Sequence, residues 1–594
     1  QVASYSYSLF CQQATGGRNL ITSTVHDDSG TADDAVLYDG FGMAVRTLST
    51  VAADKQALLT VDYDALDRPV RQYLPVPATE IDDAADAASY YGDANPYSLI
   101  SYRNLASDKP VSVISEGRLM QQHPARTEYL CNSTANAQLR CRRLRLVSGA
   151  DTEKITSDGY YPAGALDVVR ATDPDGHVAL LFTDWRGFRI LERRLLDSST
   201  FADTYFLYDP MGRLRVAVQP EGAALMTAAN GSWDNNSDVL TKYAFINRYD
   251  RRGNCVSSLV PGGGVVEMRY DGYNRLAFRS TADMAEDGKT EFTLYDRIGR
   301  VVVSGIADCD ISDIDKCYDM TASFSASAVG IDSTGYQIQD AGLSALVGNA
   351  LVTIANYYDN YNVATRAGFS SLPLDRMSPQ RAKGLLTATR QAIFSSSYGK
   401  TGARAEYQYS IFGYDSEERQ VASVSSAVMA GELRTTDIQY SRLGHVDRTT
   451  ESVVLPDSTY TLTIVNTHDA RGNITKSVAS VGSGQSEIEY AYDALGLMNR
   501  MSLHRQAGSR CEYSHDMRGR LKTIATPGFS QELYYEDGDT PCYNGSISAE
   551  DYGYETDAYT GLAWPTDKVT YSYDALNRLV GSASSDGYDT SYSY

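Results

Sequence analysis

The chain has 594 residues, a formal net charge of −22, a mean hydropathy of −0.34 and 42% hydrophobic residues. This acidity argues against nucleic acid as a partner, because phosphate binding needs clustered Lys and Arg. No run of 18 or more apolar residues occurs, so the sequence predicts no membrane span. Length alone suggests about four domains, but a motif that recurs along the chain overrides this estimate, since an array grows by adding units.

The motif is a six-residue unit, Tyr-Asp-x-x-Gly-Arg, and is clearest at 295–300. Its aspartate can accept a hydrogen bond from the backbone N–H two residues on, in an Asx-type turn. Its fifth residue, Gly299 in this copy, supplies the left-handed conformation that closes a short hairpin with a bulge. Alternating residues on either side predict pleated strands. The residues assigned to this structural repeat are Tyr63, Asp64, Tyr208, Asp209, Gly212, Arg213, Tyr249, Asp250, Gly253, Tyr270, Asp271, Asn274, Tyr295, Asp296, Gly299, Arg300, Tyr492, Asp493, Gly496, Tyr573, Asp574, Asn577 and Arg578.

Further copies begin at Tyr38, Tyr358, Tyr414, Tyr440, His468 and His515. The fifth position is Gly, Asn or Asp in every copy except that of Tyr414, where it is Glu418. These three residue types best tolerate a positive φ. A chance motif would not select for backbone conformation, so the recurrence indicates a real structural repeat.

In chain order, residues 1–80 are expected to be a strand region with the first two units, and 81–205 to be degenerate repeats with insertions. Residues 80–100, acidic and Ala-rich at 81–86, predict a surface loop with a helical turn, and 184–188 is a degenerate unit. Residues 206–306 hold the most regular repeats. Residues 307–405 contain insertions, and the segment 343–352 fits helix or strand by its periodicity. Repeats resume at 406–594, and we expect all five regions to form one continuous β-shell.

Strands of roughly five to eight residues, separated by turns, predict an all-β fold with one antiparallel sheet and few short helices. A two-stranded unit cannot bury a face alone, so the copies must join. A sheet of twenty or more strands cannot stay flat, and it should curl into a spiral or shell. The chain starts and stops inside strand-like segments, which is typical of a piece of a longer polypeptide.

The recurring Tyr-Asp-x-x-Gly-Arg resembles the YD repeat of the RHS (rearrangement hotspot) family. The segments that resemble it most are 249–276, 383–387 and 569–579. The resemblance implies a β-sheet wound into a hollow cocoon that encloses a C-terminal polypeptide, often a toxin, or that serves in cell-surface adhesion. Members with a toxin carry a self-cleavage segment after the repeats, and no match to that segment is found.

Other residue patterns in the chain fit structural roles better than binding or catalytic ones. The motif tyrosines fit a sugar-stacking row less well than packing on neighbouring units. The aspartates Asp308, Asp310, Asp313 and Asp315 suit calcium in type, but a solvated acidic loop is favoured, and Asp173-Pro174-Asp175-Gly176 is better interpreted as a turn. The seven histidines show no zinc spacing. Cys131 with Cys141, and Cys309 with Cys317, are near enough in sequence to form disulfides, and reduced thiols are the equal alternative.

The sequence therefore predicts a non-enzymatic shell, secreted or at the cell surface, without cofactor, metal or catalytic residues. Its expected partner is its own C-terminal effector or toxin, outside this chain, and a surface glycan or target-cell protein is a further possibility. The alternatives are a cell-surface adhesion or carbohydrate-binding module and, more weakly, a hydrolase within the insertions at 80–200 or 307–405.

Overall fold

The computed structural model describes residues 3–8, 19–27, 30–83, 86–104, 107–148, 153–226, 231–234, 236–314, 316–394, 406–426, 432–455, 457–504, 509–554 and 566–594. Over these residues the predicted all-β fold is confirmed: 38 strands form one sheet, beside a three-stranded and a two-stranded sheet. Every strand pairing is antiparallel, and most strands pair with the next strand along the chain.

The large sheet begins with β1 (Ala3–Ser8), β2 (Asn19–Asp27), β3 (Gly30–Tyr38), β4 (Ala44–Ala52), β5 (Lys55–Tyr63), β6 (Pro69–Tyr73), β7 (Val76–Pro77), β8 (Tyr97–Asn104), β9 (Ser107–Ile114), β10 (Ala125–Cys131), β13 (Asp167–Thr172), β14 (Val178–Thr183), β15 (Arg189–Leu195), β16 (Phe201–Tyr208), β17 (Leu214–Val218), β19 (Ala244–Tyr249), β20 (Cys255–Val260), β21 (Gly264–Tyr270), β22 (Leu276–Ser280), β23 (Thr290–Tyr295) and β24 (Val301–Ala307).

It continues with β27 (Leu351–Tyr358), β28 (Leu386–Ile393), β29 (Glu406–Tyr414), β30 (Gln420–Ser426), β31 (Leu433–Tyr440), β32 (Val446–Val454), β33 (Thr459–His468), β34 (Ile474–Val481), β35 (Gly484–Tyr492), β36 (Met498–Leu503), β37 (Arg510–His515), β38 (Leu521–Thr526), β39 (Phe529–Tyr534), β40 (Ala549–Tyr554), β41 (Asp567–Tyr573), β42 (Leu579–Ser584) and β43 (Thr590–Ser591).

The smaller sheets are β11 (Arg142–Ser148) with β12 (Glu153–Tyr160) and β18 (Ser232–Asp234), and β25 (Ala322–Phe324) with β26 (Tyr336–Ile338). The α-helices are α1 (Ala87–Tyr91), α2 (Pro220–Leu225), α3 (Asp238–Thr241), α4 (Ala282–Glu286) and α5 (Ala341–Val347). Five 3-10 turns complete the described elements: Arg118–Gln122, Ile311–Asp313, Ile331–Ser333, Asn362–Thr365 and Pro379–Arg381.

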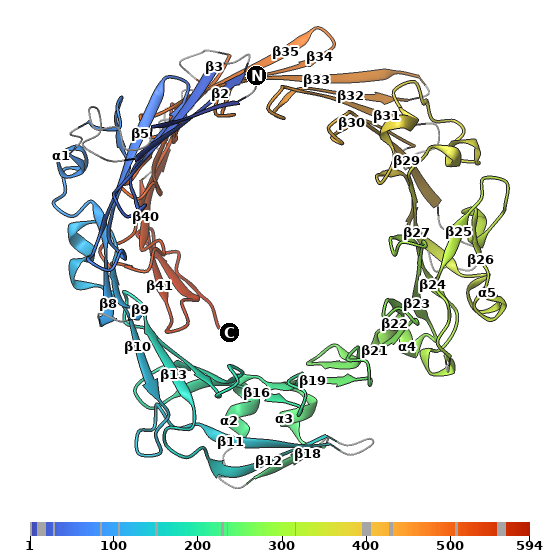
Figure 1. Ribbon diagram of the computed structural model, residues 1–594, viewed down its shortest axis with the longest axis horizontal. Helices are drawn as coiled ribbons and strands as arrows, with labels where there is room; N and C mark the ends of the chain where they lie inside the picture. Colours follow the sequence, from blue (N-terminus) through green and yellow to red (C-terminus); the bar gives the residue numbers. More distant parts are fainter. Residues whose placement is uncertain are drawn as a thin grey trace.

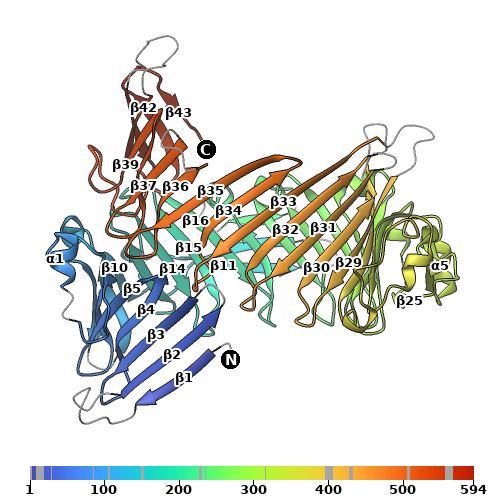
Figure 2. The same ribbon diagram turned by 90° about the horizontal axis from the view of Figure 1, so that it is seen from above.

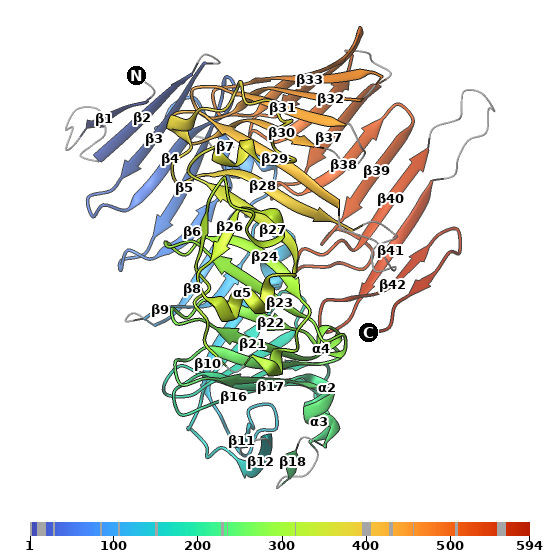
Figure 3. The same ribbon diagram turned by 90° about the vertical axis from the view of Figure 1, so that its right-hand side faces the viewer.

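The large sheet winds into a ring around an open centre (Figure 1). Its first strands, β2 to β5, lie beside β33 to β36, so the winding exceeds one turn and forms a spiral (Figures 1 and 2). The turns of the repeats lie together at one edge of the sheet, because every second strand of an antiparallel meander ends at the same edge. We call this edge the YD rim, and the edge that carries the intervening connections the opposite rim; Figure 3 shows the strands running between them.

The insertions cover the outside of the ring (Figure 1). The sheet β11–β12–β18, with α2 and α3, packs on β13 to β19 over a core that includes Phe182 and Leu191. The hairpin β25–β26, with α5, packs on β23 to β30 over a second core that includes Phe292, Leu343 and Ile411. Burial therefore concentrates between the sheet and its insertions, on the outer face.

Several local expectations are now resolved. The segment 343–352 is neither one helix nor one strand, since α5 ends at Val347 and β27 begins at Leu351. The helical turn expected within 80–100 is confirmed: α1 follows Asp86, which caps it by accepting a hydrogen bond from Ala88 N–H, while residues 84 and 85 lie outside the described residues. The alternative of disulfides across loops is wrong: the described cysteines, including Cys131, Cys141, Cys309 and Cys317, are free thiols.

Candidate functional site

The repeat unit builds one compact turn, best seen at Tyr295. The N–H of Asp296 donates to the carbonyl of Arg300 (2.9 Å), and the N–H of Gly299 donates to the carbonyl of Asp296 (3.1 Å). The Asp296 carboxylate oxygen Oδ1 accepts from the N–H groups of Ile298 (3.0 Å) and Arg300 (2.9 Å). Gly299 has a φ of 93°. One carboxylate thus fixes a tight turn whose fifth residue is left-handed, which lets the next strand restart in register after a bulge.

The same turn recurs through the chain. The fifth residue has a positive φ at Gly42, Asp67, Gly212, Gly253, Asn274, Gly299, Glu418, Gly444, Gly472, Gly496, Gly519 and Asn577. Glu418, the residue type that did not fit the pattern, still adopts a φ of 63°. The degenerate unit at Asp184 also makes the turn, with Gly187 at 83°. The unit at Tyr358 departs from it, because Asp359 itself is left-handed (72°) and Asn362 begins a 3-10 helix.

A clamp joins many of the units to the next one. Arg275, the sixth residue of its unit, donates from Nε to Oδ2 of Asp271 (2.7 Å), and its guanidinium lies 4.5 Å from the ring centroid of Tyr295 in the following unit. The Tyr295 hydroxyl donates back to the carbonyl of Leu276 (2.8 Å). Arginine and tyrosine therefore connect neighbouring hairpins by an ion pair, a cation–π contact and a hydrogen bond.

The clamp repeats along the sheet, although not at every unit. Guanidinium-to-ring distances are 4.4 Å for Arg68 and Tyr102, 4.9 Å for Arg213 and Tyr249, 4.3 Å for Arg300 and Tyr358, 4.7 Å for Arg419 and Tyr440, 4.0 Å for Arg520 and Tyr535, and 4.6 Å for Arg578 and Tyr594. Tyr63, Tyr492 and Tyr573 likewise donate to carbonyls of the preceding unit. At Tyr208 the ring of Phe188 takes the place of an arginine and stacks at 4.9 Å.

The clamp shifts the acidity of its members. The hydrogen bond from Arg68 is the main reason that the pKa of Asp64 lies below its usual value. For Asp209, burial pushes the pKa up, but hydrogen bonds from Arg213 outweigh it and the pKa is lowered. Burial raises the pKa values of Tyr63, Tyr249, Tyr295, Tyr492 and Tyr573. At neutral pH Asp64 and Asp209 are therefore charged and these five tyrosines neutral, as the clamp requires.

Where the spiral overlaps itself, the YD rim of the second turn docks on the opposite rim of the first. We call this contact the seam. Ala53 N–H donates to Oδ2 of Asp469 (3.0 Å), and Asn473 Nδ2 donates to the carbonyl of Val51 (3.0 Å). Arg471 forms a two-pronged ion pair with Asp34, both contacts at 2.9 Å.

The seam continues through later units. Arg518 donates to the carbonyl of Glu116 (2.7 Å). The N–H groups of Tyr543 and Asn544 donate to the carboxylate of Asp175, at 2.7 and 3.0 Å. These contacts join residues more than 350 positions apart in the chain, so sequence reasoning gave no sign of them.

The two faces of the second turn differ in chemistry. Ile411 and Val424 pack under the insertion and so lie on the outer face, and residues paired across antiparallel strands share a face. Following the pairs onward gives an outer face that carries Lys476, Glu487, Glu489, Arg500, Glu512, Glu532, Asp551 and Lys568.

The inner face of the same strands is richer in apolar side chains. It presents Leu462, Ile464, Ile488, Tyr490, Met501, Tyr513, Ile524, Phe529, Tyr552 and Val569, all partly exposed. The acids among its paired residues are Glu451, Glu550 and Asp567; Tyr571 donates to Glu550 (2.7 Å), and Ser584 donates to Asp567 (2.6 Å). Within the described chain, no helix lies on the inner side of the ring (Figure 1).

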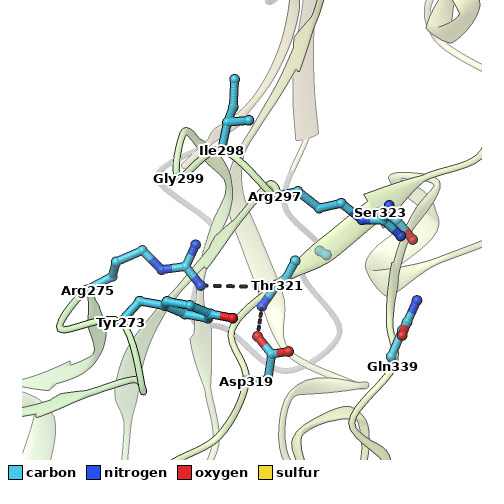
Figure 4. A pocket seen from close by; sticks show the side chains of 10 residues that line it. Tyr273, Arg275, Arg297, Ile298, Gly299, Asp319, Thr321, Ser323 and Gln339 are labelled. Atoms are coloured by element: carbon cyan, nitrogen blue, oxygen red, sulfur yellow. Dashed lines mark hydrogen bonds between the residues drawn. The ribbon is translucent and has the colours of Figure 1, made fainter.

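A pocket of about 530 Å³ lies between two turns of the YD rim and the β25–β26 hairpin. Figure 4 shows Tyr273, Arg275 and Arg297 around it, with Asp319 accepting a hydrogen bond from Thr321 N–H (3.0 Å). Asp319 is its single carboxylate, and no His or Cys lines it. The pocket therefore lacks the convergent acid, base and nucleophile that a hydrolase in the insertion 307–405 would need.

The carboxylates of the candidate calcium sites already accept hydrogen bonds from the backbone. Asp310 caps a 3-10 turn by accepting from Ser312 N–H (2.8 Å), while Asp315 lies outside the described residues. Asp173, Asp175 and His177 are close enough to hold a metal ion. However, Asp173 accepts the N–H groups of Asp175 and His177, and Asp175 accepts those of Tyr543 and Asn544 at the seam. These residues form a turn, as the sequence predicted, and this turn also belongs to the seam.

Residues 406–594 match one family model, described as Teneurin YD-shell. No curated protein matches the chain. Among solved structures, TcdB2-TccC3 is similar over 99% of this chain and 28% of its own length, with 13% identity and a TM-score of 0.50. TcdB2-TccC3 without its hypervariable C-terminal region has 13% identity, coverages of 96% and 27%, and a TM-score of 0.48. A Photorhabdus luminescens Tc holotoxin pore with a substitution in TccC3 has 13% identity and a TM-score of 0.47, over 96% of this chain and 27% of its own length.

The chain thus spans just over a quarter of the length of these structures. At this identity the likeness shows the fold alone, a spiral β-shell. The family match and the repeated turn define the class, a YD-repeat shell. The chain carries the YD repeats that its sequence indicated, its residues 406–594 match the YD-shell family, and its sheet is a structural shell. None of its described helices has the length and apolar character needed to cross a membrane.

Proposed function

We propose that the chain is the wall of a container that encloses a C-terminal effector or toxin polypeptide lying outside this sequence, and that it has no chemistry of its own. The observation that carries this proposal is the difference between the two faces of the second turn. The outer face holds charged side chains, whereas the inner face holds partly exposed apolar ones, and no helix of the described chain covers them. Exposed apolar surface of this extent marks an interaction site.

The chemistry of the inner face favours a polypeptide as the contents. Partly exposed Ile, Met and Tyr side chains offer apolar contact area without a fixed pattern of hydrogen bonds, which suits a chain that is incompletely folded. A folded enzyme of ordinary polarity would gain little from such a wall. A container for an effector also fits a secreted or cell-surface location, which we propose with it.

The test uses a tail of known sequence as the contents. A flexible segment with one protease site and several leucines is fused after Tyr594, which lies within the outline of the ring in Figure 1. The same tail on an unrelated carrier is the reference. We expect cleavage at least about tenfold slower on the shell, because cleavage then requires local opening. Equal cleavage rates on shell and carrier would overturn the proposal.

Neighbouring residues of β33 supply matched variants. Ile464 lies on the inner face and Val465 on the outer face, since they pair with Thr449 and Arg448 respectively. Ile464→Glu should speed cleavage of the fused tail, because it places a charge on the apolar wall. Val465→Glu should leave it unchanged. If both variants act alike, the inner face does not hold the tail.

Surface recognition is a second candidate, favoured by one observation. Phe41, Trp185 and Tyr273, at turns of the YD rim in the first turn of the spiral, are 81%, 87% and 74% exposed. Exposed aromatic residues of this kind are enriched at protein interfaces. Binding of the purified chain to target cells that is lost in Trp185→Ala would support this candidate, and unchanged binding would remove it.

A further inference from the structure

The repeats that begin the seam lack the arginine–tyrosine clamp. In the unit of Tyr440 the sixth residue is His445, and in the next unit the first residue is His468. Their rings stack with centroids 5.3 Å apart and an angle of 28° between planes. Two imidazoles thus stand where other neighbouring units place a guanidinium over a phenol.

The two histidines lie next to the residues that make the first contacts of the seam. His468 is followed by Asp469, Arg471 and Asn473, which hold Ala53, Asp34 and Val51 of the first turn. A Cβ built on Gly472 would lie 2.3 Å from Cε1 of His445, so the His445 ring packs tightly against the turn that docks. Any displacement of the two rings is therefore transmitted to the turn at the seam.

Few charges face the two rings. Oδ1 of Asp447, on β32, lies 3.3 Å from Nδ1 of His468, and its side chain is 45% exposed, against 7% for His468. The carboxylate of Asp469 is already taken by the N–H groups of Arg471, Asn473 and Ala53 and by the side chain of Asn473.

Two arginines stand in the adjoining turns. Arg442 is exposed, and Arg471 is paired with Asp34. In the described part of the chain, Asp447 is thus the carboxylate within ion-pairing distance of either ring, one acid for two imidazoles.

We propose that His445 and His468 form an acid-sensitive latch, which keeps this end of the seam closed while at least one ring is neutral and loosens it when both are protonated. Histidine gains its charge between about pH 5 and 8. Asp447 is placed to balance the charge of one protonated ring, that of His468. A second proton places like charges face to face at stacking distance in a mostly buried site, and separating the rings relieves this repulsion.

The far end of the seam has the opposite chemistry. The ring of His123 stacks on Tyr543 of the second turn with centroids 3.4 Å apart, and Nδ1 of His177 lies 3.1 Å from Oδ2 of Asp173. A proton on His123 adds a cation–π attraction, and one on His177 adds an ion pair. Acid should therefore loosen the seam from one end while the other end holds.

Backbone amides report on both ends. Ala53 N–H crosses the seam at the latch, and Tyr543 and Asn544 N–H cross it at the far end. Hydrogen exchange of the full chain is measured at about pH 7.5 and about pH 5.5 and corrected for the intrinsic rate. We expect about tenfold faster exchange at Ala53 in acid, the effect of roughly one pH unit of coupling, and no acceleration at Tyr543 or Asn544. Equal changes at both ends, or none, would overturn the latch.

A variant that restores the clamp isolates the cause. The double substitution His445→Arg with His468→Tyr installs the pair found between other units of this chain, and it should abolish the acid response at Ala53. His26→Gln, which changes an exposed histidine outside the seam, should keep it. An acid response that persists in the double variant would show that other groups cause it. The inference concerns closure of the seam, so it stands or falls independently of any contents of the shell.

Discussion

The hairpin turns of the YD units share one design but serve two purposes in this molecule. In the first turn of the spiral the fourth residue of the unit stands free, as at Phe41, Met211 and Ile298, which are 81%, 78% and 77% exposed. In the second turn the corresponding residues Arg471 and Arg518 reach across the seam to Asp34 and Glu116. The hydrogen bonds inside the turn do not differ between the two regions.

The comparison separates two roles of one motif. The aspartate and the left-handed fifth residue close the hairpin, and they do so wherever the unit occurs. The fourth residue contributes to the contact between the two turns of the spiral, and it does so only where the opposite rim lies against it. A matched pair of substitutions, one in each region, therefore measures the seam alone, because effects on the turn itself cancel.

The largest difference is expected for arginine in the fourth position. Arg518 is 14% exposed and contacts Glu116 and Glu536, whereas Arg252 is an exposed arginine at the same position of a free unit. Arg518→Ala should lower the free energy of local opening at the seam by about 2 kcal/mol, because it removes the hydrogen bond to the Glu116 carbonyl and the ion pair with its carboxylate. Glu536 keeps its ion pair with Arg520. Arg252→Ala should change it by less than about 0.5 kcal/mol. Hydrogen exchange of residues 116–118 checks both variants.

If Arg518→Ala proved as mild as Arg252→Ala, the seam would not depend on these side chains. The glycine pair described next would then decide whether the backbone contacts alone hold the two turns together.

Glycine in the fifth position gives a smaller and sharper contrast. Gly299 (φ 93°) and Gly496 (φ 81°) are both left-handed, but a Cβ on Gly299 meets open space and one on Gly496 lies 2.7 Å from the carbonyl oxygen of Val51. Gly299→Ala should cost about 1–2 kcal/mol through backbone strain. Gly496→Ala adds a clash with the first turn of the spiral. We expect this clash to raise the loss of stability by about 1 kcal/mol and to expose the hairpin turn at 51–55. Thermal unfolding midpoints and hydrogen exchange at Ala53 would measure this extra loss. Identical midpoints and exchange rates for both variants would mean that the two rims separate freely.

The turn was predictable from the sequence because everything that determines it lies within six residues. Asp296 and Gly299 specify their own hydrogen bonds and φ, and alternation on either side indicates the strands that follow. The antiparallel sheet and its curvature follow from adding such units. The insertion at 343–352 was ambiguous for a local reason: its apolar residues fit either period, and Asp340, which caps α5, is what starts a helix there.

The seam was not predictable, for an equally physical reason. Which residue meets Ala53 depends on the pitch and circumference of the spiral, which accumulate small twists over the more than 400 residues that separate it from Asp469. No local pattern encodes that sum. The loss of the arginine–tyrosine clamp at His445 and His468 is visible in the sequence, but only the structure shows that it falls where the two turns meet.

The smallest expected effect concerns Glu418, the one fifth residue that breaks the residue pattern yet adopts the left-handed backbone, with a φ of 63°. A glutamate pays a steric penalty there that glycine avoids, while glycine loses more entropy on folding. The balance predicts that Glu418→Gly stabilises the 415–419 turn by about 0.5 kcal/mol. Asn274→Gly, at a φ of 61°, should be close to neutral, because asparagine already tolerates this region. Hydrogen exchange of Glu418 and Asn274 N–H, which donate to Asp415 and Asp271 within their turns, measures each effect. Destabilisation by Glu418→Gly would mean that the glutamate side chain makes a contribution beyond its backbone, and that fifth positions are chosen for more than a positive φ.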